Sequence, residues 1–413
     1  MLNNIEADLA KNLLLRYAVE PETEVTPLRS GLGRVLAEDV YVHIPMPPFD
    51  RSPYDGYALS SNDTINATEE SPVLLRVLET IPAGSMPGFQ ITTGTATKIM
   101  TGAPIPKGAD AIVNFERTAF TATEVKLFTP VQKGQNVIHT GEDMPIGSFL
   151  AGKGTSLNAH QTGSLAEQGI SELQVYRKPV VTIINTGNEL VETNHPRPEG
   201  KIYNSNAYTL GGILASQGML IRDGGIAEDD PAKIAAHIET ALASSGLVVT
   251  SGGVSVGDFD YMQAAARLLE MEPLFWRVKM RPGGSMMACK KEGKLLLCLS
   301  GNPGAAVIGL YRVALPCIRK LCGRKDVEME TIHVRLKESL DKESRQMRML
   351  RGQLFIEDGL AFFAVNHKFS SDLQSGQGGG DMSSLLGFNL LGEIPAGSPP
   401  IREGALIKAY RIG

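Results

Sequence analysis

The stretch from Leu247 to Tyr261, LVVTSGGVSVGDFDY, decides the fold. An apolar run typical of a β-strand, Leu247 to Val249, stops before the pair Gly252-Gly253, and a helical pattern begins at Tyr261. The stretch therefore predicts a strand, a glycine loop and a helix. Paired glycines let the backbone approach a ligand and aim N–H groups at an anion, and the next helix adds the positive end of its dipole. Such a loop suits a phosphate.

The same loop carries two aspartates, Asp258 and Asp260. Carboxylates repel a bare phosphate unless a divalent cation lies between them, and magnesium is the natural bridge. The alternative is a tight turn in which one aspartate merely caps the following helix. From this stretch by itself both interpretations stand.

The composition predicts a soluble globular protein. The chain has 413 residues, 42% of them hydrophobic, and a formal net charge of -5, which suits two to four domains. No basic run indicates nucleic-acid binding, and no apolar run reaches the roughly 18 residues that a membrane helix needs. We therefore expect a cytoplasmic protein without nucleic-acid or membrane partners. Its cysteines follow neither CxxC nor metal-site spacing and are expected to be buried reduced thiols; they are Cys289, Cys298, Cys317 and Cys322.

The first half of the chain is predicted to hold a helix over residues 5–19, a proline-rich loop and a β-rich region. The loop, IPMPPFDRSPYDGYA, begins at Ile44 and has too many prolines for a helix or a central strand. It is either a ligand loop or a domain linker. Short β-type runs fill residues 72–143, and two loops there, MTGAPIPKGAD and HTGEDMPIG, either face a ligand or only join strands. A helix is expected between Asn158 and Gly169.

From Lys178 onward the pattern alternates strands with helices, as in a doubly wound α/β domain of about 150 residues. Ligands of such domains lie at the carboxyl ends of the strands. Four loops are expected at that edge: TGNEL, SGGVSVGDFD, RPGGS and SGNPG. From about Asp326 the sequence becomes β-like again, which predicts a small C-terminal β-barrel or sandwich.

These loops, in this order, resemble the molybdopterin molybdenumtransferase family, the bacterial MoeA proteins and the E domain of gephyrin. The likeness spans nearly the whole chain and rests on FDRSPYDGYA, IMTGAPIP, GED, TGNEL, YNSN, DDP, SGGVSVGDFDY, FW followed by RPG, and SGNP. It implies a homodimer that takes adenylylated molybdopterin and molybdate, releases AMP and leaves molybdenum on the dithiolene sulfurs. Magnesium is the implied cofactor, and the adenylyltransferase of the preceding step is a candidate partner.

The resemblance also implies a domain division: 1–45 with 145–176 as an elongated N-terminal domain, 46–144 as a β-rich insert, 177–325 as a molybdopterin-binding, MogA-like α/β domain, and 326–413 as a C-terminal β-barrel domain.

Cleaving a phosphoanhydride needs carboxylates that hold a cation, and backbone donors for phosphate. By similarity the catalytic residues are Asp55, Thr101, Asp143, Glu189, Asp229 and Asp260, of which Glu189, Asp229 and Asp260 are expected to bind the metal. The substrate-binding residues are Gly252, Gly253, Ser255, Gly257, Arg281, Asn302 and Pro303. Asp50 and Asp258 are weaker candidates, since each could be a turn carboxylate.

The sequence departs from the family pattern at several positions. Where the family usually has Lys-Pro-Gly-Lys-Pro, this chain has Arg281-Pro282-Gly283-Gly284-Ser285, so one cation becomes arginine and another is absent. Ser300 replaces a usual proline, Arg51 and Pro53 alter the proline-rich loop, and Gly379 falls where serine is usual. Loss of one preorganised cation could lower the rate by roughly two or three orders of magnitude. Lys279 or Arg351 could replace it.

Three functions are compatible with these motifs. The first is molybdenum insertion. The second is adenylylation of molybdopterin, because the α/β domain resembles that of the enzymes which perform this preceding step. A stand-alone adenylyltransferase would not need the loops around Asp55 and Thr101. The third is a binding or scaffold protein with little turnover, which the missing lysine at Gly284 favours and the acidic residues disfavour.

Overall fold

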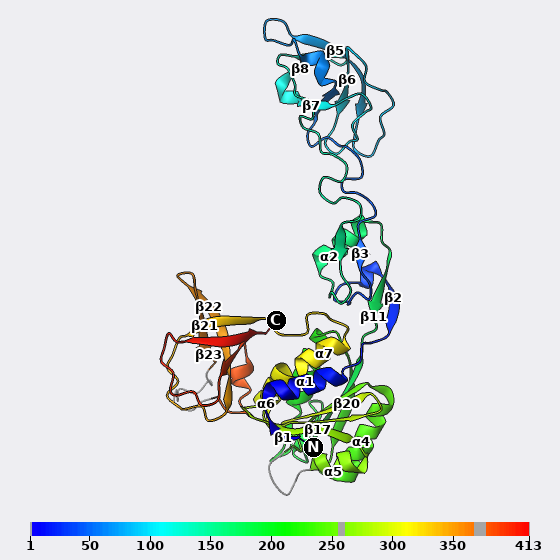
Figure 1. Cartoon of the computed structure of the whole chain (residues 1–413). Coiled ribbons are helices and arrows are strands. Elements are labelled where there is room, and N and C mark those ends of the chain that lie inside the picture. Colours follow the sequence, from blue (N-terminus) through cyan, green and yellow to red (C-terminus); the bar gives the residue numbers. More distant parts are fainter. Residues whose placement is uncertain (1, 255–260, 367–376, 413) are drawn as a thin grey trace. The chain divides into compact units, whose positions relative to one another are not determined.

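The computed structural model describes residues 2–254, 261–366 and 377–412, and the chain divides into two compact units. Unit 1 comprises Met1–Glu38, Lys153–Ala159 and Ser171–Gly413, and unit 2 comprises Asp39–Gly152 and His160–Ile170. Both units are therefore built from separate segments of the chain, as the colours of Figure 1 show. None of the described helices is long and apolar enough to cross a membrane.

Within the described part of unit 1, the main sheet has seven strands in the order β1-β17-β19-β20-β16-β12-β15. Its centre is parallel: β16 pairs with β20 on one side and β12 on the other, and β12 pairs with β15. The near-continuous apolar runs of β12, β16 and β20 fit strands that are covered on both faces, whereas the first half of β15, at the edge, is exposed. The strands are β1 (Leu2–Ile5), β12 (Val180–Thr186), β15 (Leu220–Ala227), β16 (Leu247–Ser251), β17 (Glu272–Val278), β19 (Met287–Lys291) and β20 (Lys294–Leu299).

Helices pack on both faces of this sheet. One core joins Ile183 and Val249 to α3, α6 and α1, and a second core joins Ile184 and Val248 to α4 and α5. Alternate residues of one strand thus enter opposite cores, which confirms the predicted doubly wound α/β fold. The helices are α1 (Ala7–Tyr17), α3 (Ser205–Ser216), α4 (Pro231–Ser244), α5 (Tyr261–Leu268), α6 (Pro303–Gly309) and α7 (Leu315–Leu321).

The antiparallel part of the sheet differs from the expectation. The sequence analysis predicts no strand at residues 287–291, yet β19 pairs antiparallel with both β17 and β20. The N-terminal residues Leu2–Ile5 also form a strand, which pairs parallel to β17 before the predicted helix begins. The thiols are buried as expected, and burial raises the pKa of Cys289 to about 12.

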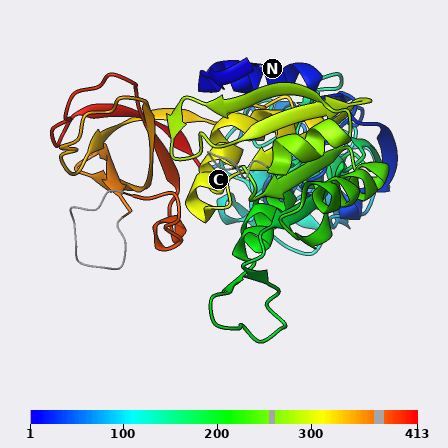
Figure 2. The same cartoon turned by 90° about the horizontal axis from the view of Figure 1, so that it is seen from below.

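The C-terminal part of unit 1 is a closed β-barrel, as predicted. Its described strands form a ring in the order β22-β23-β21-β25-β24, which closes through the pairing of β24 with β22. Figure 2 shows this ring in orange to red. The short strand β18 (Met280–Arg281) pairs with β22 and ties the barrel to the α/β domain. The strands are β21 (Thr331–Leu336), β22 (Met347–Glu357), β23 (Leu360–Val365), β24 (Leu390–Ile394) and β25 (Leu406–Arg411).

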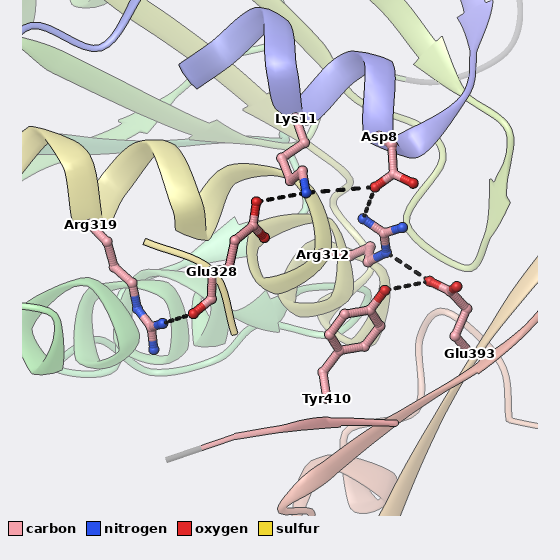
Figure 3. Close-up of polar contacts among 7 residues, drawn as sticks. All are labelled: Asp8, Lys11, Arg312, Arg319, Glu328, Glu393 and Tyr410. Carbon is pink, nitrogen blue, oxygen red and sulfur yellow. Dashed lines mark hydrogen bonds and ion pairs between the residues drawn. The ribbon is translucent and has the colours of Figure 1, made fainter. Parts of the chain in front are cut away.

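A buried arginine also connects the barrel to the rest of unit 1 (Figure 3). Pro316 has no N–H to continue the helical ladder, and the helix widens to a π turn at Leu310–Ala314. Arg312 in this turn is 3% exposed; its Nη1 lies 3.0 Å from Asp8 of α1 and its Nε lies 3.0 Å from Glu393 of β24. The Tyr410 hydroxyl donates to Glu393 at 2.7 Å. Three separate stretches of unit 1 therefore share one charged cluster.

Unit 2 is rich in β-structure, as predicted for the insert. Its described residues form a six-stranded sheet in the order β7-β4-β6-β5-β9-β8, around a core that includes Tyr57 and Leu75. A separate pair joins β3 (Val40–Tyr41) to β10 (Phe149–Ala151). The sheet strands are β4 (Gly56–Leu59), β5 (Val73–Ile81), β6 (Thr95–Ile99), β7 (Ala111–Asn114), β8 (Thr118–Phe120) and β9 (Glu124–Leu127). The expected helix is α2 (Ala159–Glu167), and it begins where the chain passes between the units.

Candidate active site at the carboxyl edge of the sheet

A cleft of about 690 Å³ lies at the carboxyl ends of β12, β16 and β20 in unit 1. The loops that follow these strands form its walls, together with the start of α3, and Gly380 and Met382 add to it from the C-terminal region. All four loops expected at this edge thus contribute, and the RPGGS loop does so through Ser285. Among the predicted residues, those that line the cleft are Glu189, Asp229, Gly252, Gly253, Asn302 and Pro303.

The glycine pair after β16 adopts backbone conformations that favour glycine. Gly252 has φ +105° and Gly253 has φ +66°, both in the left-handed region. A Cβ atom at Gly252 would lie 2.3 Å from the carbonyl oxygen of Thr186, so the two loops touch through their backbones. The Gly252 N–H donates to the Leu299 carbonyl at 3.1 Å, which joins the glycine loop to the end of β20. Ser255, Gly257, Asp258 and Asp260 lie outside the described residues.

Two predicted carboxylates come to the cleft from different strands. Glu189 follows β12 and Asp229 follows β15. The Asn188 backbone N–H donates to the Asp229 carboxylate at 3.1 Å, and the Asp229 N–H donates to the Asn188 side-chain oxygen at 3.2 Å. This reciprocal pair holds the two loops together and leaves the second carboxylate oxygen of Asp229 available.

The donor set fits magnesium in part. Carboxylate and amide oxygens are the ligands this cation prefers, and it usually keeps several waters beside one or two carboxylates. Glu189 and Asp229 supply two carboxylates. In the residues that the structure describes, no group of three or more His, Cys, Asp or Glu could hold a metal ion. The third expected ligand, Asp260, lies outside those residues.

The remaining predicted acidic residues and Thr101 lie in unit 2, where three loops meet. Isolated bridges join Arg51 to Pro104 and to Ile138, and Met46 to Met144. These contacts bring Asp50, Asp55, Thr101 and Asp143 to neighbouring loops, and Asp143 is exposed. The proline-rich segment is therefore part of a folded unit, not a free linker.

Asp55 and Thr101 are in direct contact. The backbone N–H and the hydroxyl of Thr101 both donate to the Asp55 Oδ1 at 2.7 Å, and these bonds lower the pKa of the Asp55 carboxyl below its ordinary value of 3.8. Thr140 makes the same pair of bonds to Asp50, at 2.7 and 2.8 Å, and likewise lowers its pKa. The Thr101 hydroxyl, for which similarity implied a catalytic role, thus orients the Asp55 carboxylate.

The predicted cation positions do not gather at the cleft. Arg281 is exposed on β18, outside the set of lining residues. Lys279 forms an ion pair with Glu6 at 2.8 Å. Arg351 is 0% exposed, its Nη2 donates to the Gly378 carbonyl at 2.9 Å, and burial lowers its pKa to about 10. It approaches the first turn of α6 closely enough that a Cβ atom at Gly304 would lie 2.5 Å from its Nη1.

The sequence analysis missed polar residues at the inner end of the cleft. Asn185, Asn206 and Ser251 line it and are buried. The Asn206 side-chain amide donates to Ser251 Oγ at 2.5 Å and to the Gly301 carbonyl at 2.8 Å, which joins α3 to the loops after β16 and β20. A polar residue at the carboxyl end of an otherwise apolar buried strand was the available signal, and in β12 this residue is Asn185.

The fold and the cleft define a class: multidomain proteins whose doubly wound α/β domain holds a ligand at a glycine loop, combined with a β-rich insert and a C-terminal barrel. Residues 5–169 match the family model described as MoeA N-terminal region (domain I and II), and residues 182–320 match the one described as probable molybdopterin binding domain. The chain belongs to the MoeA family of molybdopterin molybdenumtransferases, enzymes of molybdenum cofactor biosynthesis.

Individual relatives agree with this assignment. A molybdopterin molybdenumtransferase from Staphylococcus epidermidis is 34% identical over 340 residues, covering 82% of this chain and 81% of the relative. One from Staphylococcus aureus is 34% identical over 326 residues, covering 79% and 78%. The crystal structure of a molybdopterin biosynthesis MoeA protein from Pyrococcus horikoshii matches with a TM-score of 0.82 at 30% identity, over 99% of this chain and 100% of that one. The resemblance inferred from the motifs is thereby confirmed.

Proposed function

We propose that this protein inserts molybdate into adenylylated molybdopterin and releases AMP. The observation that carries the proposal is the cleft at the carboxyl edge of the sheet, where the Gly252-Gly253 cradle faces the carboxylates of Glu189 and Asp229. In the reaction the phosphoanhydride bond to AMP is hydrolysed by water. The two dithiolene sulfurs replace two oxygens of molybdate, which leave as water. The oxidation state of molybdenum does not change, so no redox partner is needed.

The residues of the cleft divide this work. The Gly252 N–H donates to the Leu299 carbonyl at 3.1 Å and holds the loop in place. The backbone N–H group at Gly253 binds the pterin phosphate beside Gly252, with Ser255 and Gly257 as further proposed contacts. Glu189 and Asp229 hold magnesium, with Asp260 as the proposed third ligand. Magnesium, when bound, neutralises charge on the leaving phosphate. Asn302 and Pro303 begin α6 and shape the facing wall.

Asp55, Thr101 and Asp143 of unit 2 are proposed as further catalytic residues. The contact between Asp55 and Thr101 supports this assignment, because it holds the Asp55 carboxylate ionised and in one orientation. Arg281 is proposed as the oxyanion contact that replaces the usual lysine. We further propose a cytoplasmic homodimer that receives its substrate from the adenylyltransferase of the preceding step.

A weakly catalytic binding protein is the second candidate, and one observation favours it. A Cβ atom at Gly284 would lie 2.4 Å from the backbone oxygens of both Val278 and Met280, so the lysine usual at this position does not fit this turn. Stand-alone adenylylation is less well supported, because it would leave the loops around Asp55 and Thr101 without a role.

The deciding experiment incubates the purified protein with adenylylated molybdopterin, magnesium and molybdate and follows AMP release. We expect turnover that depends on magnesium, and in Glu189→Gln a loss of roughly 100-fold or more, because the variant removes one cation-binding charge from an active site. Circular dichroism checks that the variant is folded. Binding of the substrate without AMP release by the parent protein would establish the scaffold function instead. A Glu189→Gln variant that keeps the parent rate would remove Glu189 from the proposed metal site.

A further inference from the structure

Asn185 occupies an unusual position within the cleft. It is the penultimate residue of β12, lies beside Ser251 of β16 in the parallel register, and is 1% exposed. Among the residues that the structure describes, neither its amide nitrogen nor its amide oxygen has a hydrogen-bond partner. Its buried neighbour Asn206, by contrast, donates to two acceptors. Asn185 is nevertheless one of the residues that line the cleft in which the substrate is proposed to bind.

Stability does not account for an amide at this position. A buried polar group without a partner keeps its full desolvation penalty, whereas an apolar side chain of the same size would carry none. The preceding residues of β12 follow that rule, since Ile183 and Ile184 fill the two cores. The hydroxyl of Thr186, the next residue, is also buried without a partner. Orphaned donors and acceptors therefore gather at the end of β12.

The amide of asparagine presents a donor beside an acceptor in one plane. Its complement is a flat ring edge that carries an acceptor beside a donor, and such pairs are bidentate, as between asparagine and adenine. Both ring systems of the substrate proposed above carry such an edge: the pyrimidinone of the pterin and the aminopyrimidine of adenine. We propose that Asn185 is a specificity-determining residue that binds the heterocycle of the substrate through this edge. The inference rests on the proposed function for the identity of the ring.

The test measures ring binding without turnover. Isothermal titration calorimetry compares AMP and 6-hydroxymethylpterin as separate ligands of the parent protein and of Asn185→Leu, which removes both amide groups at similar size. We expect the affinity for one of the two rings to fall roughly 5- to 150-fold, which corresponds to the loss of one bidentate pair. The ligand that binds more weakly to Asn185→Leu than to the parent protein carries the ring that Asn185 contacts. The melting temperature without ligand is expected to stay unchanged or to rise, because the orphaned groups are gone.

Thr182→Val is the matched control. Thr182 lies on the same strand and is equally buried, but its hydroxyl is bonded to Ser245 at 2.7 Å, and it is not part of the cleft lining. This variant is expected to lower the melting temperature by about 2 °C and to leave both affinities unchanged. If Asn185→Leu does not fold, Asn185→Ser is measured in its place.

An ordered water as the partner of Asn185 would leave both affinities unchanged in Asn185→Leu, and that result overturns the inference. A parent protein that binds neither ring overturns it as well. Failure of the proposed function appears in a different measurement, namely AMP release by the parent protein, so the two outcomes remain distinct.

Discussion

Two adjacent aspartates, Asp229 and Asp230, have separate roles that the structure resolves. Asp229 lines the cleft, whereas the Asp230 carboxylate accepts from the N–H groups of Ala232 and Lys233 at 2.9 Å and so caps α4, with Pro231 in its first turn. The sequence Asp-Asp-Pro carries the signal for this start, since aspartate favours the N-cap and proline the first helical position.

We expect Asp230→Ala to lower the free energy of unfolding by about 0.5 to 2 kcal/mol while AMP release persists, because only the helix cap is lost. Asp229→Asn should do the opposite and reduce AMP release roughly 100-fold at unchanged stability, because it removes a cation-binding charge. Urea unfolding and the AMP assay on both variants provide the check. Equal effects of the two substitutions on activity would contradict the division of roles.

The contact between Thr101 and Asp55 leads to a prediction about pH. The folded pKa of Asp55 lies below 3.8, so the carboxylate is fully ionised above that pH and becomes protonated only as the pH falls through the lower, folded value. Thr101→Val removes the hydroxyl donor but keeps the backbone N–H, so the pKa should rise toward 3.8 and AMP release should fall. Thr101→Ser should restore both. Carboxyl ¹³C shifts followed across a pH titration measure the pKa, and an identical value in all three proteins would show that the hydroxyl does not orient Asp55.

How much of the site could be predicted depends on the kind of residue. Gly252 and Gly253 were predictable because their chemistry is local: no side chain fits their backbone. Glu189 and Asp229 were expected by similarity to the family motifs TGNEL and DDP, and both line the cleft at the carboxyl edge of the sheet. Asn185 was missed, since an asparagine at the end of an apolar strand looks like the start of a loop, and its lack of partners is a property of the packed structure.

At the scale of elements, the turn after β18 explains why this chain has glycine, and not the usual lysine, at position 284. Gly283 has φ +95°, and Gly284 approaches two backbone oxygens at a distance that no Cβ atom tolerates. Restoring lysine at Gly284 therefore does not test molybdate affinity as the sequence suggests, because the turn would first have to rearrange.

Gly284→Ala is expected to lower the free energy of unfolding by about 1 to 3 kcal/mol, as for other overpacked sites. The matched control is Gly212→Ala in α3, where a Cβ atom meets nothing within 4 Å and helix propensity should add about 0.5 to 1 kcal/mol of stability. Urea unfolding of both variants measures the difference. A neutral Gly284→Ala would show that the turn can open, and the lysine substitution would then become informative.

Among the elements, the central parallel strands were predicted well because their signal is a local apolar run. The strand β19 was not, since its residues Met287–Lys291 include two terminal lysines and gain their strand partners from β17 and β20. The strand β24 was missed for a related reason: Leu390–Ile394 contains a glycine and completes the barrel through pairs on both sides. Pairing between distant segments decides such strands, and it is not visible in a short window.

At the scale of the whole molecule, the Arg312 cluster fastens the barrel to the rest of unit 1. Arg312→Met should lower the free energy of unfolding by about 3 kcal/mol, because it leaves Glu393, whose side chain is 12% exposed, without its cation. Asp8→Asn should cost less than about 1 kcal/mol, since the Asp8 side chain is 65% exposed and its pair is screened by water. Fluorescence of Trp276 in β17, the one tryptophan of the sequence, reports unfolding of unit 1.

The Asp8 variant also has an expected pH dependence. Burial acts to raise the pKa of Asp8, but the hydrogen bond and charge of Arg312 outweigh it and lower the pKa below 3.8. The contribution of Asp8 is therefore complete above pH 3.8 and is lost as the pH falls through the lower, folded pKa. The difference between parent and Asp8→Asn should shrink only in that acidic range. A difference that already disappears near neutral pH would contradict this account.

The parallel pairing of β1 with β17 sets an order of events while the chain is being synthesised. Leu2–Ile5 leave the ribosome long before their strand partners at residues 275–278, which are made some 270 residues later. At about 5 to 20 residues per second, this delay lasts from roughly fifteen seconds to a minute. Every residue of unit 2 has been synthesised by Ile170, so unit 2 can fold while β1 still exposes an unpaired edge. The nascent chain consequently passes through a stage in which β1 is open to chaperones and to aggregation.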